Sequence, residues 1–255
     1  MSSLPSLNDL LGLCKLKVVS LILLTAIVGM LLAVPYLPNL FLVLVASAGI
    51  SLAAMSAAVF NHVVDEKIDI QMSRTDRRPL PQGKVTRRQA LIWGAFLGVV
   101  GIMLLIVFVN FLTAVLTLIS LIGYAVFYTM YLKRATPQNI VIGGAAGAFP
   151  PAIGWLAAGG GLTIEPLVLF AIIFIWTPPH FWALALVKNE DYTRAGVPMM
   201  PVVAGATSTK TQIFVYSIAL AVIAITPSFI GMASLYYGVF AAVLSAIFLK
   251  FAYDL

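Results

Sequence analysis

The sequence predicts an all-α fold, a polytopic membrane helix bundle with about eight transmembrane helices. Of its 255 residues, 62% are apolar and only 9% are charged, whereas about a quarter of the residues in a soluble domain are charged. Because so few charges cannot cover a water-facing surface, the composition excludes a soluble enzyme and a disordered chain. The single cysteine, Cys14, excludes an internal disulfide.

Eight stretches are apolar and long enough to cross the hydrocarbon core, which takes about 20 residues per helix. They are 16–36, 40–60, 90–109, 111–132, 140–157, 166–187, 212–232 and 235–253. Short breaks that contain Gly, Pro or Asn separate several of them. The first residues resemble neither a cleavable signal peptide nor an Arg-rich transit segment, which favours internal insertion into a bacterial plasma membrane.

The charged residues predict the orientation of these helices. With alternating crossings, all 15 Lys and Arg residues fall on one side of the membrane, which the positive-inside rule assigns to the cytoplasm. All nine Asp and Glu residues except Glu165 fall on that side too. We therefore expect the N-terminus and the polar loops 61–89 and 188–211 to be cytoplasmic and to carry the functional site. Orientation also accounts for the net charge of +6 without nucleic-acid binding.

The first polar loop begins with three oxygen-bearing side chains at a helical spacing. Asn61, Asp65 and Asp69 are four residues apart, so they share one face if the second apolar helix continues beyond residue 60. Oxygen ligands without cysteine suit Mg²⁺, which is commonly completed by substrate phosphates. The alternative is a solvated helix end in which Asp65 and Asp69 pair with neighbouring basic residues.

Three arginines follow in the same loop, Arg74, Arg77 and Arg78. Guanidinium groups bind phosphate oxygens in a bidentate manner. Together with the acidic residues and the apolar helices, they indicate a substrate with a diphosphate head group and an apolar tail. Thr86 and Gln89 then form a predicted capping box that starts the next helix.

The second polar loop has a similar order of residues. Glu190 and Asp191 stand at a helix exit, Arg194 follows, and Pro198 and Pro201 come next. The similarity suggests two related halves of four helices, each of which contributes one acidic loop.

On four motifs the sequence resembles the UbiA superfamily of intramembrane prenyltransferases, and within it the branch that modifies haem. The motifs are N-x-x-x-D-x-x-x-D with M-x-R-T-x-x-R-P-L in residues 61–80, and the segments 128–151, 177–182 and 192–203. The resemblance covers residues 15 to 205 and implies one domain over 1–255. Members of this superfamily usually have nine membrane spans, so one open alternative is that the last helix is absent from this chain.

The resemblance implies transfer of a farnesyl group from farnesyl diphosphate to the 2-vinyl group of haem B, assisted by Mg²⁺. Asn61, Asp65 and Asp69 would bind one Mg²⁺, and Glu190 or Asp191 a second. The diphosphate would be held by Arg74, Arg78 and Lys133. The remaining implied substrate contacts are Arg77, Tyr128, Asn139, His180, Tyr192, Lys188 and Arg194. The implied partners are the lipid bilayer and a haem A synthase or a factor of terminal oxidase assembly.

The two histidines allow different interpretations. His180 lies in an apolar stretch, where it either binds the haem or is a hydrogen-bonded packing residue. His62 follows Asn61 and is expected to be solvated. Two rival functions also remain, prenyl transfer to an aromatic or quinone precursor and a non-enzymatic transporter or haem carrier. The location of nearly all charges at one face argues against the transporter.

Overall fold

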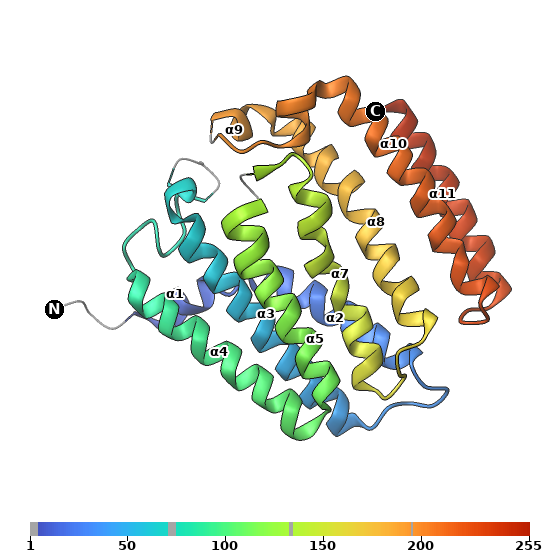
Figure 1. Cartoon of the computed structure of the whole chain (residues 1–255), viewed down its shortest axis with the longest axis horizontal. Helices are drawn as coiled ribbons and strands as arrows, with labels where there is room; N and C mark the ends of the chain where they lie inside the picture. The colour runs from blue at the N-terminus through green and yellow to red at the C-terminus, as the bar shows by residue number, and fades with distance from the viewer. Residues whose placement is uncertain (1–4, 71–74, 133–134, 195) are drawn as a thin grey trace. The chain divides into compact units, whose positions relative to one another are not determined.

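The computed structural model describes residues 5–70, 75–132, 135–194 and 196–255, which are helical and contain no strand (Figure 1). The all-α prediction is therefore confirmed for this part of the chain. The helices are α1 (Leu7–Gly12), α2 (Leu16–Leu32), α3 (Leu40–Asp69), α4 (Arg87–Phe108), α5 (Phe111–Ile122), the π-helix η1 (Gly123–Leu132), α7 (Asn139–Ala157), α8 (Ile164–Val187), α9 (Asn189–Arg194), α10 (Met200–Phe229) and α11 (Leu235–Asp254).

Seven helices of the described residues are long and apolar enough to cross a membrane, with α5 and η1 forming one continuous span. They correspond to seven of the eight predicted stretches. The remaining stretch forms α2, which has 17 residues and ends at Leu32 rather than at residue 36. Pro35 explains the early end, because proline disfavours helical geometry in the residue before it. The chain is thus a multi-pass membrane protein.

The predicted loop 188–211 is wrong in its second part, because α10 already begins at Met200. Pro201 stands in the first turn of α10, where its missing N–H removes no helical hydrogen bond. The backbone leaves helical geometry at Gly205, whose φ of +77° is accessible to glycine. Pro201, Gly205 and the polar residues 207–211 interrupt the apolar pattern, so hydropathy alone did not identify this helical segment.

The helices form two compact units, residues 1–131 with 149–161, and residues 132–148 with 162–255. In the first unit α3 packs against α2, α4 and α5. The C-terminal half of α7 crosses α2 at very short range. A Cβ at Gly29 would lie 2.0 Å from the Pro151 carbonyl oxygen, and one at Gly154 would lie 1.9 Å from the Ala26 carbonyl oxygen. Only glycine permits backbones to approach so closely, as is common between membrane helices.

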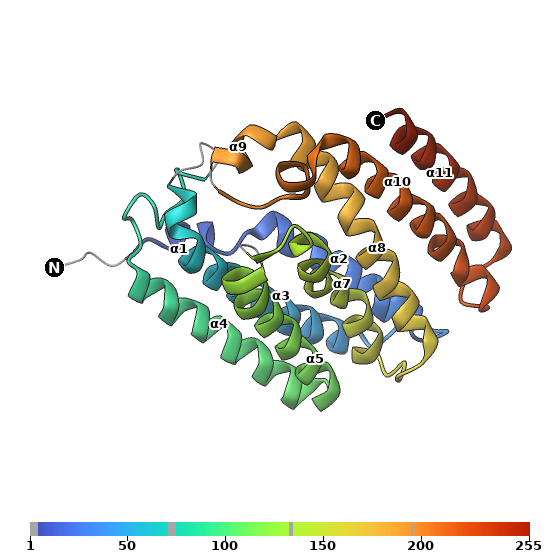
Figure 2. The same ribbon diagram turned by 45° about the horizontal axis from the view of Figure 1, so that its top comes forward.

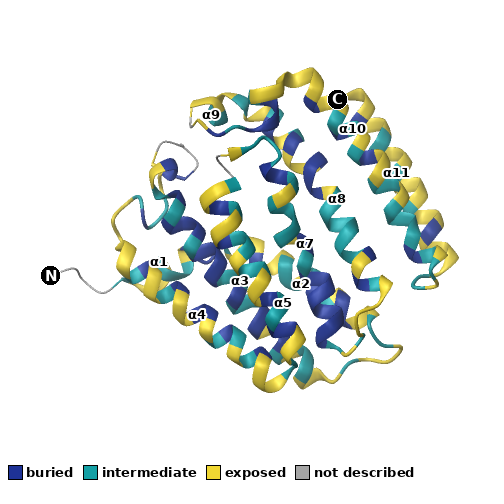
Figure 3. Cartoon of the chain, viewed as in Figure 1, coloured by how far each residue is buried: buried dark blue, intermediate teal, exposed yellow. Residues whose placement is uncertain are grey.

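In the second unit α10 lies between α8 and α11, in both views of the ribbon (Figure 2). Large apolar side chains are exposed along α10 and α11, whereas the buried residues of the first unit concentrate on α3 (Figure 3). Such exposed apolar surface is the expected lipid-facing surface of a membrane protein.

The start and the length of helix α3 determine where the site lies. At its start the Asn39 side chain accepts hydrogen bonds from the backbone N–H groups of Phe41 and Leu42. At its other end α3 continues to Asp69, nine residues beyond the predicted apolar stretch. The next helix, α4, starts with the predicted capping box of Thr86 and Gln89, which is confirmed.

Candidate metal and diphosphate site

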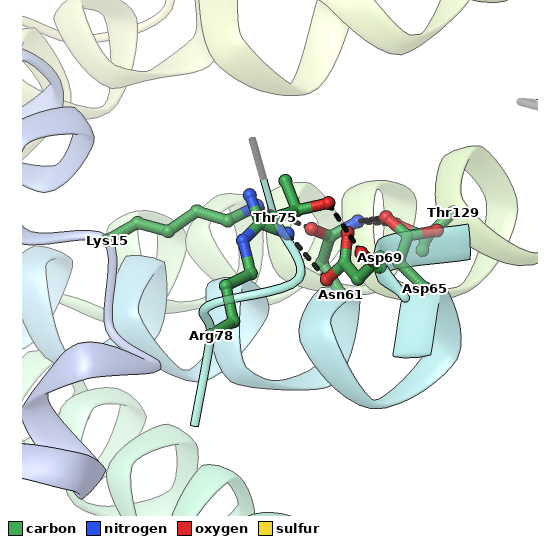
Figure 4. Close-up of polar contacts among 7 residues, drawn as sticks. All are labelled: Lys15, Asn61, Asp65, Asp69, Thr75, Arg78 and Thr129. Carbon is green, nitrogen blue, oxygen red and sulfur yellow. Dashed lines mark hydrogen bonds and ion pairs between the residues drawn. The ribbon is translucent and has the colours of Figure 1, made fainter. Parts of the chain in front are cut away.

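The last turns of α3 carry Asn61, Asp65 and Asp69, which are 3%, 3% and 4% exposed. Their common face is drawn in Figure 4. The prediction that these side chains lie on a continuing helix is confirmed. Burial of two carboxylates is unfavourable unless charged or hydrogen-bonding groups compensate it, so the partners of these side chains determine what the site can bind.

The amide of Asn61 is fixed by three contacts. Its Nδ2 donates to Asp65 Oδ2 at 2.9 Å and to Thr129 Oγ1 at 3.3 Å, and its Oδ1 accepts from Lys15 Nζ at 2.5 Å. An amide nitrogen can only donate and an amide oxygen can only accept. The carboxylate on one side and the ammonium on the other therefore define the orientation of the amide.

Thr129 reaches this site from the π-helix η1. Its hydroxyl donates to the Tyr124 carbonyl oxygen at 2.7 Å, which leaves the hydroxyl oxygen to accept from Asn61. The rings of Tyr124 and Tyr128 stack beside it with centroids 5.5 Å apart. π-Helical turns are rare overall but over-represented at functional sites, and this one brings the buried hydroxyl of Thr129 to Asn61 on α3.

The loop after α3 folds back onto the helix end. Arg78 Nη1 lies 2.6 Å from Asp69 Oδ2, and the Thr75 hydroxyl donates to the Asp69 carbonyl oxygen at 3.0 Å. The Arg78 N–H donates in turn to the Thr75 carbonyl oxygen. The Arg78–Asp69 ion pair is the kind of contact that the alternative of a charge-paired helix end expects. Beside this ion pair, the Asn61 amide between Lys15 and Asp65 adds an oriented neutral oxygen to the same face.

The donor set fits a divalent metal ion that also binds substrate. Within residues 5–70, 75–132, 135–194 and 196–255, no three His, Cys, Asp or Glu side chains are grouped to hold a metal by themselves. The site offers two carboxylates and one amide oxygen instead. Hard oxygen donors in this small number are typical of Mg²⁺, which takes its remaining ligands from water and substrate phosphates.

Residues 22–255 match the UbiA prenyltransferase family. The chain belongs to this family. Among curated relatives, the protoheme IX farnesyltransferase of Ruthia magnifica subsp. Calyptogena magnifica is 62% identical, over 98% of this chain and 84% of the relative. The protoheme IX farnesyltransferase of Psychromonas ingrahamii is 51% identical, over 97% of this chain and 80% of the relative.

Solved structures of UbiA proteins share the fold of this chain. A digeranylgeranylglyceryl phosphate synthase superposes with a TM-score of 0.82 at 18% identity, covering 96% of this chain and 86% of the other. A UbiA homologue from Archaeoglobus fulgidus bound to DMAPP and Mg²⁺ has a TM-score of 0.77 at 16% identity, with the same coverage. The UbiA-type fold predicted from the motifs is therefore confirmed.

The other residues that the motifs single out are more dispersed. Arg74 and Lys133 lie outside the described residues. Arg77 is exposed in the loop that follows α3. The remaining residues belong to the second unit, where Glu190, Lys188 and Arg194 are exposed and Asp191 and Tyr192 are half-buried.

Asn139 and His180 have distinct environments in the second unit. Asn139 is fully buried, and its amide donates to the carbonyl oxygens of Thr136 at 2.8 Å and Pro198 at 3.4 Å. The exposed His180 ring stacks on Trp176 with centroids 4.3 Å apart and meets the edge of Phe181 at 5.2 Å. Asn139 thus joins two of the motif segments, whereas His180 belongs to an exposed aromatic group on the membrane-spanning helix α8.

The expected solvation of His62 is wrong, since its side chain is only 2% exposed. This end of α3 lies in a core cluster with Leu13, Cys14 and Leu80, which come from the N-terminal turn and the loop after α3. Both ring nitrogens lack a hydrogen-bond partner among the described residues. The helical angle between Asn61 and His62 could not reveal that segments distant in the sequence bury His62.

Sequence reasoning missed Lys15, Thr75 and Thr129 as members of the site. Lys15 entered the argument only as an orientation charge. Thr75 and Thr129 lie inside UbiA motifs, but a motif gives no role to a hydroxyl.

Proposed function

We propose that this chain transfers a farnesyl group from farnesyl diphosphate to the 2-vinyl group of haem B and releases diphosphate. The observation that carries the proposal is the 62% identity to a protoheme IX farnesyltransferase over 98% of this chain. The buried acidic face of α3 supports it, because a prenyl diphosphate leaves only if its growing negative charge is neutralised.

We propose Asn61, Asp65 and Asp69 as ligands of Mg²⁺, which when bound supplies this neutralisation together with cationic side chains. The Archaeoglobus fulgidus homologue of the same fold, bound to DMAPP and Mg²⁺, supports the choice of ion. Arg78 already lies at the acidic face and is the first candidate for a diphosphate contact. Arg74 and Lys133 are proposed for the same role on their motifs.

The reaction that these residues serve is an ionisation followed by carbon–carbon bond formation. The carbon–oxygen bond of the allylic diphosphate breaks, and its electron pair leaves with the diphosphate. The π electrons of the vinyl group then form the new bond to the allylic carbon. Water adds to the resulting cation and loses a proton, which gives a hydroxyethylfarnesyl haem, haem O. The stacked rings of Tyr124 and Tyr128 can stabilise the allylic cation through their π faces.

The second unit carries the remaining proposed contacts. We propose Glu190 or Asp191 as ligands of a second Mg²⁺ and Lys188 or Arg194 as partners of the haem propionates. His180, stacked on Trp176, is proposed as the residue that orients the macrocycle or binds its iron. Arg77, Asn139 and Tyr192 are retained as substrate contacts on their motifs alone.

Localisation follows from the charge distribution. We propose a bacterial plasma membrane with the N-terminus and both acidic loops in the cytoplasm. The chain would act as a single prenyltransferase domain over 1–255. A haem A synthase or an oxidase assembly factor would receive its product.

A product assay tests the proposed function. Membranes that contain this chain receive haem B, farnesyl diphosphate and Mg²⁺, with an EDTA-treated sample as the control, and extracted haems are identified by mass spectrometry. We expect a Mg²⁺-dependent haem that carries a hydroxyethylfarnesyl group. Prenylation of added hydroxybenzoate with no change in haem would overturn the proposed acceptor and retain the prenyl transfer.

A further inference from the structure

Lys15 enters the site from a fixed and unfavourable backbone position. It is the only non-glycine residue with positive φ among the described residues, at +50°. Left-handed geometry is unfavourable for an L-residue and persists only where its surroundings enforce it. Here Leu13 and Cys14 are completely buried before it, and the Lys15 carbonyl oxygen accepts from Val18 and Val19 at the start of α2. The Lys15 backbone is therefore held next to the core cluster that Leu13 and Cys14 share with Val59 and Val63 of α3.

From this position the Lys15 ammonium donates to the amide oxygen of Asn61, the same atom that the proposed function assigns to the metal (Figure 4). The Nδ2 of this amide donates to Asp65 and Thr129, so the amide cannot rotate without losing these hydrogen bonds, and its one oxygen stays on the Lys15 side. An ammonium and a divalent cation on one oxygen would lie within a few ångströms of each other and repel strongly. Metal coordination by Asn61 therefore requires displacement of the Lys15 ammonium.

We propose that Lys15 is a positioning residue that couples metal binding to diphosphate binding. Its ammonium holds Asn61 Oδ1 toward the site. When the metal binds this oxygen, the ammonium changes its partner from Asn61 to the diphosphate. The flexible four-carbon stem and the three donors of lysine suit such a change of partner. Since this inference rests on the metal site of the proposed function, its test must separate the two.

The coupling predicts opposite effects of one substitution on two ligands. The Lys15→Met variant lacks the ammonium that competes with the metal for the Asn61 amide oxygen. Mn²⁺ alone should therefore bind about tenfold to a hundredfold more tightly than to wild type, which is the range expected for loss of one charge-assisted hydrogen bond. The same variant should bind a farnesyl thiodiphosphate analogue about tenfold more weakly at saturating Mg²⁺, because a cation for the diphosphate is lost. Damage to the fold would instead weaken the binding of both Mn²⁺ and the analogue.

The experiment uses the purified full chain in detergent, with Mn²⁺ followed by electron paramagnetic resonance and the analogue by equilibrium dialysis. Lys17→Met is the matched control, since it removes an equal charge from an exposed position two residues away. Lys15→Arg keeps the charge and should shift both measurements less than Lys15→Met does.

The outcomes separate the hypotheses. Equal or weaker Mn²⁺ binding by Lys15→Met would overturn the coupling, as would equal shifts in Lys17→Met or in Lys15→Arg. Wild-type Mn²⁺ binding in Asp65→Asn and Asp69→Asn would instead refute the metal site itself.

Discussion

The substitution Asp65→Asn tests the acidic face with little change in shape. The carboxamide has nearly the volume of the carboxylate, and its oxygen can still accept from Asn61 Nδ2, the contact that Asp65 makes at 2.9 Å. The substitution therefore removes one negative charge and preserves the local hydrogen bond. Asp69 pairs with Arg78, and the Asn61 amide that donates to Asp65 also holds the Lys15 ammonium, so the loss of one carboxylate leaves an excess of positive charge at the site.

The expected loss of rate follows from the interaction energy between one carboxylate and one positive charge at the site. Two unit charges 4 Å apart interact by about 4 kcal/mol at the effective dielectric constant of about 20 that suits such sites. Loss of about 4 kcal/mol in the transition state lowers the rate about a thousandfold. Haem O formation at saturating substrate should therefore fall about a thousandfold or more, while membrane insertion stays close to that of wild type. Asp65→Ala and Asp69→Ala should both abolish transfer as well.

Asp76→Asn is the matched control, since Asp76 is exposed in the loop beyond the site and should retain wild-type turnover. A rate within tenfold of wild type for Asp65→Asn would refute the assignment of this carboxylate to the metal. An equal loss in Asp76→Asn would attribute the effect to the general charge of the loop.

Three further substitutions test other parts of the molecule. Thr129→Val leaves one N–H of the buried Asn61 amide without its acceptor, a loss of about 1–3 kcal/mol that should lower both the unfolding temperature in detergent and the rate of transfer. Arg78→Met should lower the rate of transfer about a hundredfold to a thousandfold, the range for loss of one preorganised donor, and an unchanged rate would remove it from the diphosphate site. Gly154→Ala should markedly destabilise the first unit, because its Cβ would lie 1.9 Å from a backbone oxygen of α2, whereas Gly147→Ala, with nothing within 4 Å, should be neutral or stabilising in the same thermal assay.

The membrane helices and the acidic face were predictable because their signals are local. An apolar stretch of about 20 residues has few structural alternatives, and a four-residue spacing determines a helical face as soon as the helix exists. The capping box of Thr86 and Gln89 belongs to the same class, since both of its hydrogen bonds join residues three apart. Each of these predictions needed only neighbours in the sequence.

The partners of the acidic face were not predictable, because they come from distant segments. Lys15 precedes Asn61 by 46 residues and Thr129 follows it by 68. The sequence separation of these residues from Asn61 does not predict a contact with α3. The π-helical turn that brings Thr129 to the site has no sequence signature here either. His62 shows the same limit, since the turn and loop that cover it can be located only in the folded chain.

The arrangement of charges explains how an apolar helix bundle tolerates an acidic face at all. Isolated carboxylates would be very unfavourable at this burial. Asp65 lies against the Asn61 amide, whose oxygen holds the Lys15 ammonium, and Asp69 lies against Arg78. If Asn61, Asp65 and Asp69 hold Mg²⁺ as proposed, an incoming dication and its diphosphate would exchange partners with charges that are already desolvated. Lys15 and Arg78 would then pair with the diphosphate instead of with these side chains. Exchange of this kind avoids burying an uncompensated charge, and it makes binding of the metal and of the diphosphate mutually dependent.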